Sequence, residues 1–135
     1  MTVQQIHEYI WDKVIDYCDK HTPSYDDHDY THIEKVNAII QLREDKKISR
    51  DAYNILVVQC ACVLCALYSR LSCTDCPLFL REKRTCHSVL SDFHKVRREY
   101  DVEAAKRIRD VDVLSGYEPN KEKISVLEEE DYVQD

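Results

Sequence analysis

Glycine and proline are scarce in this chain, which has one glycine and three prolines in 135 residues. Tight β-hairpin turns depend on glycine, because their central residues adopt positive φ angles. A chain with one glycine has few such turns, which favours helices over hairpins, and we expect an all-α fold. The single glycine, Gly116, also excludes a glycine-rich loop that would hold phosphate through its backbone.

The chain also lacks a long apolar run. Its longest uncharged stretch, residues 52–69, contains Asn54 and Gln59 and is too short and too polar for a transmembrane helix. Residues 1–9 include Glu8 and lack the apolar core of a secretory signal. We therefore expect no membrane segment and a cytoplasmic location, where the seven cysteines are thiols or metal ligands rather than disulfides.

Catalytic motifs are missing as well. The chain contains neither a Ser-His-Asp arrangement nor a His-Glu-x-x-His motif, so we expect a protein that is not an enzyme. His28 and His32 lie four residues apart beside acidic residues, and such a group could hold a divalent metal or transfer protons. Because no further ligand is identifiable, we interpret them as part of an acidic loop that caps the following helix.

Apolar periodicity predicts a compact bundle of four helices. Thr2 and Gln5 form a capping-box pattern at the start of the first helix, and Thr31 and Glu34 repeat that pattern at the second. The third helix is predicted to begin near Ser49 and to be apolar nearly all round. The predicted helices are residues 3–19, 32–43, 49–71 and 86–111, with a loop at residues 72–84. Residues 1–115 are predicted to form a single domain, and residues 116–135 an acidic, partly mobile tail.

The cysteines carry the strongest signal, because six of the seven lie between Cys60 and Cys86. Four thiolates bind zinc as a tetrahedron, and a CxxC pair supplies two of them from one turn. The loop after the third helix has few apolar residues to bury, so a bound metal would stabilise it. The predicted structural zinc ligands are Cys65, Cys73, Cys76 and Cys86, with Cys62 and His87 as alternates.

Other interpretations of these cysteines stay open. A redox dithiol, an iron–sulfur cluster and unliganded thiols are the alternatives to zinc. A thioredoxin-like site would need a βαβ unit, for which the chain offers no strands. We expect Cys18 and Cys60 to be buried as small apolar side chains.

The segment from Cys65 through Cys73 and Cys76-Pro77 to Cys86 resembles cysteine clusters in small, uncharacterised phage-encoded proteins. These proteins likewise place a CxxCP knuckle after a helix and close it with a later cysteine. The resemblance covers about 22 residues and departs in the spacings. It implies a structural zinc and an origin in a mobile genetic element. A phage-encoded protein would be located in the host cytoplasm.

Charge is distributed unevenly along the chain, whose net charge is −7. Residues 1–34 carry two lysines against eight acidic residues, and residues 118–135 carry two against seven. We therefore expect a small regulator or inhibitor whose acidic surfaces engage a basic protein, including one that handles nucleic acid. Homodimerisation also remains possible. The predicted partner-binding residues are Asp26, Asp27, Asp29, Glu128, Glu129, Glu130 and Asp131.

Two alternative binding modes remain. Residues 81–109 carry nine basic against five acidic residues, so the last helix could contact phosphate. The tail segment 124–127 resembles SUMO-interacting motifs and could add a strand to the edge of a partner's sheet. The residues of the nucleic-acid alternative are Arg97, Arg98, Lys106, Arg107 and Arg109, with Lys83 and Arg84 as further candidates.

Overall fold

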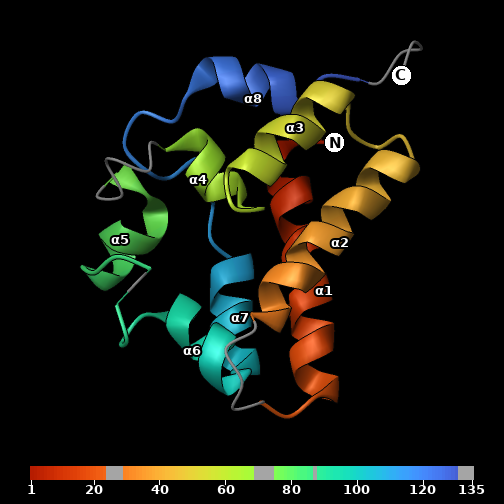
Figure 1. Ribbon diagram of the computed structural model, residues 1–135. Helices are drawn as coiled ribbons and strands as arrows, with labels where there is room; N and C mark the ends of the chain where they lie inside the picture. The colour runs from red at the N-terminus through yellow and green to blue at the C-terminus, as the bar shows by residue number, and fades with distance from the viewer. Residues whose placement is uncertain (24–28, 69–74, 87, 131–135) are drawn as a thin grey trace.

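The computed structural model describes residues 1–23, 29–68, 75–86 and 88–130. Within these ranges the chain forms helices and no strand, which confirms the all-α class (Figure 1). The fold has more helices than predicted, because two of the expected long helices are divided and two short ones lie outside them. The helices are α1 (Val3–Lys20), α2 (Tyr30–Glu44), α3 (Arg50–Val58), α4 (Val63–Leu67), α5 (Pro77–Glu82), α6 (Asp92–Glu99), α7 (Val102–Arg109) and α8 (Lys121–Leu127).

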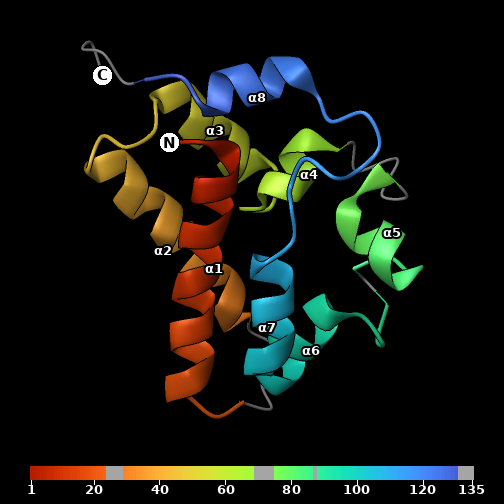
Figure 2. The ribbon, with the colours of Figure 1, turned by 180° about the vertical axis from the view of Figure 1, so that it is seen from behind.

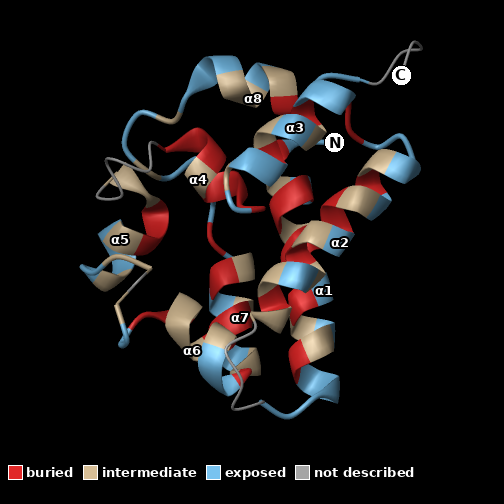
Figure 3. Ribbon diagram, in the orientation of Figure 1, coloured by how far each residue is buried: buried red, intermediate tan, exposed pale blue. Residues whose placement is uncertain are grey.

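The first helix begins as its sequence predicts. The Thr2 side chain accepts a hydrogen bond from the Gln5 backbone N–H, and the Gln5 side chain accepts one from the Thr2 N–H. This reciprocal pair satisfies donors that an uncapped helix start leaves unpaired. Val3, Ile6, Ile10 and Val14 recur at three- or four-residue spacing and are all buried, so this apolar stripe of α1 supplies a central part of the core (Figure 3).

Two helices pack directly along α1, and the others build outward from them. Helices α2 and α7 pack along it, and α6 packs against α7 (Figures 1 and 2). Helix α8 lies over α3 and α4 at the end of the molecule where α1 begins. The Val3 backbone N–H donates to the Glu128 carboxylate over 2.9 Å, which joins the start of α1 to the end of α8.

The predicted helix at residues 49–71 is wrong in its length. Ser49 caps α3 as expected, but the helix ends at Val58, and α4 starts at Val63. Between them Cys60 and Ala61 adopt left-handed φ angles of 60° and 57°. This conformation is unfavourable for residues with a Cβ atom. Ala61, Cys62 and Val63 are all buried, so packing of this turn against the core, rather than a local helix breaker, ends the helix.

The predicted helix at residues 86–111 is divided as well. Ser91 caps α6 and Asp101 caps α7, each by accepting a hydrogen bond from a backbone N–H three residues on. Tyr100 lies between the two helices in a left-handed conformation, with its ring 5.4 Å from that of Tyr17 in an edge-on arrangement. Both capping residues are of types that favour helix starts, but the apolar spacing by itself predicted one continuous helix.

Two further expectations need correction. The predicted loop at residues 72–84 contains α5, which begins with Pro77 at a position where proline's missing N–H costs nothing. Helix α2 is capped by Asp29 rather than Thr31, because Asp29 accepts the His32 backbone N–H over 3.0 Å.

The tail segment expected to offer a strand is helical. Residues 124–127 belong to α8, which Asn120 caps, and Leu127 is 1% exposed.

Among the residues that the structure describes, no helix combines the length and the apolar content that crossing a bilayer requires.

Candidate metal centre

A cavity of about 350 Å³ lies between α2, α4, α5 and α6, and cysteines line much of it. Its apolar wall comes from Leu64, Leu78, Phe79 and Phe93. Polar and charged side chains complete the lining. The cavity-lining cysteines are Cys60, Cys62, Cys65, Cys76 and Cys86, and the other charged or titratable lining residues are Asp29, His32, Lys35, Tyr68 and Arg97.

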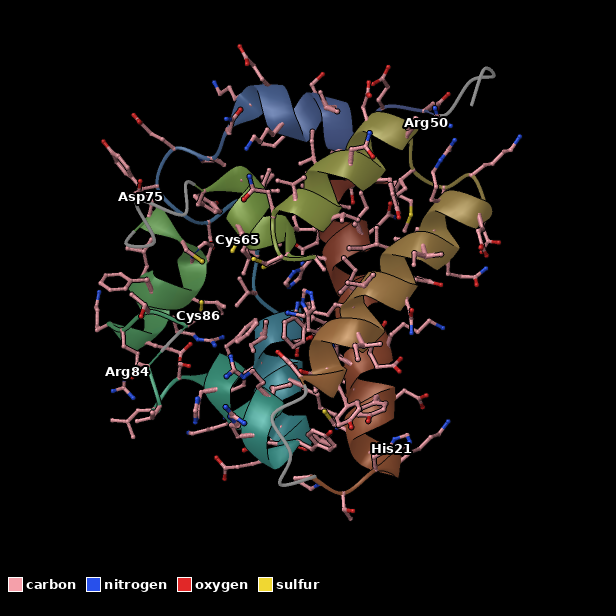
Figure 4. The ribbon with its side chains drawn as sticks, in the orientation of Figure 1. His21, Arg50, Cys65, Asp75, Arg84 and Cys86 are labelled. Carbon is pink, nitrogen blue, oxygen red and sulfur yellow. The ribbon has the colours of Figure 1, made fainter. Side chains whose placement is uncertain are left out.

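The cysteines reach the cavity from separate elements. Cys62 is the residue that precedes α4, and Cys65 lies within α4. Cys76 precedes α5, and Cys86 follows it. Figure 4 shows Cys65 and Cys86 on neighbouring segments beside α5. The break between α3 and α4 contributes to this arrangement, because it redirects the chain just before Cys62.

Three of the four predicted zinc ligands, Cys65, Cys76 and Cys86, therefore share one cavity with the alternate Cys62. Cys73 and the alternate His87 lie outside the described residues. Within the described part of the chain, no three His, Cys, Asp or Glu side chains stand close enough together to hold a metal ion. The structure brings these cysteines to a common space without arranging them as a completed coordination sphere.

The two remaining cysteines differ. Cys18 is buried on α1, as expected, and burial raises the pKa of its thiol to about 11. The expectation for Cys60 is wrong, because the left-handed turn after α3 leaves this residue exposed at the cavity.

The environment of the cavity affects its thiols unequally. The interaction between the Cys62 and Cys65 side chains lowers the pKa of Cys62 and raises that of Cys65. The positive charge of Lys35 also lowers the pKa of Cys62. Burial raises the pKa of Cys76 to about 12. A negative charge on one cysteine is therefore stabilised mainly at the Cys62–Cys65 pair.

Sequence reasoning missed Lys35. This residue is only 3% exposed, and its Nζ lies 4.3 Å from the ring centroid of Phe93 and 5.5 Å from that of Trp11. Its place on the inner side of α2 was detectable, since Lys35 is four residues before the buried Ile39. His32, on the same helix, also lines the cavity, and burial lowers its pKa, which favours the neutral imidazole.

The predicted acidic surface is divided between opposite ends of the molecule. Asp29 lies at the start of α2, whereas Glu128, Glu129 and Glu130 follow α8 at the other end (Figure 1). Asp29 is occupied within the fold, because it caps α2 and its carboxylate lies 3.9 Å from the Arg97 guanidinium. Glu129 and Glu130 are exposed. Asp26, Asp27 and Asp131 lie outside the described residues.

The predicted basic face is also interrupted. Arg97 and Arg98 belong to α6 and the other three residues to α7, so they do not share one helix. Four of the five form ion pairs with acidic side chains inside the fold, at distances from 2.9 to 3.9 Å. These pairs are Arg97–Asp29, Lys106–Glu103, Arg107–Asp92 and Arg109–Asp110, and Arg109 also pairs with Asp12.

No protein-family model, curated protein or solved structure matches this chain. The resemblance to phage-encoded cysteine clusters therefore stays an expectation from cysteine spacing alone.

Proposed function

We propose that the protein is a non-enzymatic interaction protein whose cysteine centre holds a structural zinc ion. The observation that carries this proposal is the convergence of Cys65, Cys76 and Cys86 on one cavity from three separate segments. Thiolates are the ligands that structural zinc sites use most, and a tetrahedral site needs four. Cys73, from the same CxxC pair as Cys76, would supply the fourth ligand.

A metal in this position has a clear physical role. Helix α5 is only six residues long, and isolated helices of that length are unstable in water. Within the described residues, only Pro77 and Leu78 of α5 are buried. Zinc bound across α4 and both ends of α5 would stabilise this region, so that metal-binding free energy becomes folding free energy. Such a centre needs reduced thiols, which is consistent with a cytoplasmic location.

The zinc is tested by elemental analysis with native mass spectrometry on protein purified without chelator. We expect one zinc per chain and no visible absorbance band. Cys76→Ser should release the metal and lower the melting temperature sharply, whereas Cys18→Ser, at a buried cysteine away from the cavity, should cost far less. Absence of metal from the wild-type protein would refute the proposal, and a visible absorbance band with bound iron would replace zinc by an iron–sulfur cluster.

The partner is proposed to be a basic protein that docks at the acidic end after α8. Glu129 and Glu130 carry this part of the proposal, because they are exposed and neighbour Glu128. Electrostatic attraction of this kind weakens with salt. Anisotropy of a fluorescent oligo-arginine peptide measures it directly.

The double variant Glu129→Gln/Glu130→Gln should bind the oligo-arginine peptide more weakly than the wild-type protein. Glu99→Gln/Glu103→Gln is the matched control, because it also removes two negative charges, from exposed side chains on α6 and α7 that lie away from this surface. Equal losses for the two double variants would show that only net charge matters, and would refute a localised acidic docking surface.

A further inference from the structure

The ammonium group of Lys35 is buried, and within the described part of the chain no carboxylate forms an ion pair with it. Its Nζ instead lies over the ring faces of Phe93 and Trp11. A buried charge is strongly unfavourable unless an opposite charge compensates it. Cation–π contact with two rings compensates only in part. The position therefore requires a negative charge nearby.

The cavity identifies which groups supply that charge. Among the described residues that line the cavity, Asp29 is the one with a carboxylate, and it already caps α2 and faces Arg97. His32 is favoured in its neutral form. Tyr68 also lines the cavity, but burial raises the pKa of its hydroxyl, which favours the neutral form, and Arg97 is positively charged. Of the lining groups that the structure describes, the cysteines are therefore the ones that can carry the compensating charge, and the charge of Lys35 acts on Cys62.

We propose that Lys35 is the charge-compensating residue of the cysteine centre, where its ammonium offsets the negative charge of the metal-bound thiolates. This inference rests on the zinc centre proposed above. A zinc ion with four thiolates carries a net charge of about −2, which is costly in an apolar cavity. Lys35 places a fixed positive charge at that cavity, and Phe93 and Trp11 hold it in position. Lys35 does not coordinate the metal and acts through the thiolates as a positioning and charge-balancing group.

Lys35→Met tests the inference because it predicts two effects of opposite sign. Methionine keeps an unbranched apolar side chain and removes the charge. Without metal, the variant should unfold at a higher urea concentration than the wild-type protein, because a buried charge with incomplete compensation is gone. With metal, its affinity for Zn²⁺, measured by competition with a chromophoric chelator, should fall about 10- to 100-fold, as is typical when a group supporting metal ligands is lost.

Lys13→Met is the matched control. Lys13 also lies over an aromatic ring, with its Nζ 5.2 Å from the Tyr9 centroid, but it is exposed on α1 and does not line the cavity. This variant should bind Zn²⁺ like the wild-type protein. Lys35→Arg should retain most of the zinc affinity, since it restores the charge.

The outcomes separate the two proposals. If the wild-type protein binds zinc but Lys35→Met binds it within twofold of the wild type, the role of Lys35 is refuted while the zinc centre stands. If Lys35→Met destabilises the metal-free protein, Lys35 is a packing residue and the inference is again refuted. If the wild-type protein binds no zinc, both proposals fail.

Discussion

Asp92 joins three helices through one carboxylate, so Asp92→Asn should destabilise the fold. Its Oδ2 accepts hydrogen bonds from Arg81 Nη2 at 2.9 Å and Arg107 Nε at 3.0 Å. Its Oδ1 accepts one from Arg107 Nη2 at 2.9 Å. The two arginines come from α5 and α7, while Asp92 begins α6 and is 6% exposed. This ion-pair network therefore attaches α5 to α6 and α7.

The size of the effect follows from these contacts. A hydrogen bond to a charged group contributes about 1.5–3 kcal/mol. The side chains of Arg81 and Arg107 are 38% and 49% exposed, so water replaces part of what they lose. Asparagine also keeps one acceptor oxygen. We therefore expect Asp92→Asn to lower the free energy of unfolding by about 2–3 kcal/mol, which lowers the melting temperature by roughly 6–12 °C.

Acid should remove this difference. The hydrogen bond from Arg107 is the largest of the effects that hold the pKa of Asp92 below its ordinary value. A carboxyl group with a depressed folded-state pKa stabilises the protein above its unfolded pKa of about 3.9, and the contribution is lost as pH falls through the folded pKa. Urea denaturation at pH 7 should thus separate wild type and Asp92→Asn fully, and the separation should shrink below about pH 4.

Asp16→Asn provides the matched control for the same chemical change. Asp16 pairs with Lys20 on α1 at 3.1 Å, and its side chain is 60% exposed. Exposed pairs of this kind contribute little, so we expect a change below about 0.5 kcal/mol. Two results would refute the role of the Asp92 carboxylate. One is an Asp92→Asn protein as stable as the Asp16→Asn control at pH 7, and the other is a stability difference from wild type that does not shrink in acid.

Three further substitutions test the packing of the C-terminal segment by urea denaturation. Leu127→Ala should lower the free energy of unfolding by about 2–4 kcal/mol, because Leu127 is 1% exposed where α8 packs on α3 and α4; a change below about 1 kcal/mol would show that α8 is dispensable. Gly116→Ala should cost about 1–3 kcal/mol, since the added methyl would overlap the Tyr68 ring and the Asp75 carbonyl; an unchanged stability would contradict this close approach. Tyr68→Phe should cost about 1–2 kcal/mol, because its hydroxyl donates to the Val113 carbonyl at 2.7 Å and accepts the Gly116 N–H at 3.0 Å; a neutral result would mean that water replaces both bonds.

The helix starts were predicted correctly where the capping interaction joins residues close in the sequence. The Thr2–Gln5 capping box and the Ser49 cap both form as expected, because each joins residues three positions apart. The caps at Ser91 and Asp101 are of the same kind and were readable, but the apolar periodicity of residues 86–111 outweighed them. Giving the two capping residues more weight than the apolar periodicity would have predicted two helices there.

The break between α3 and α4 was not predictable from local rules. Cys60 and Ala61 adopt left-handed angles although neither is glycine, asparagine or aspartate. The burial of Ala61, Cys62 and Val63 stabilises this turn, and burial depends on elements distant in the sequence. The same turn brings Cys62 to the cavity and leaves Cys60 exposed.

The sequence by itself determined the helical class, the start and apolar stripe of α1, and the cysteine spacing that pointed to a metal. These properties depend on composition and on residues a few positions apart. Only the tertiary structure decided which side chains share the cavity. Lys35 on α2 shares the cavity with cysteines that lie 25 or more positions later in the chain. The packing of the helices likewise decides which acidic and basic residues are separated and which are paired. The physical reason is that burial and charge pairing depend on which residues are neighbours in space. Those neighbours are determined by how the helices pack around the core.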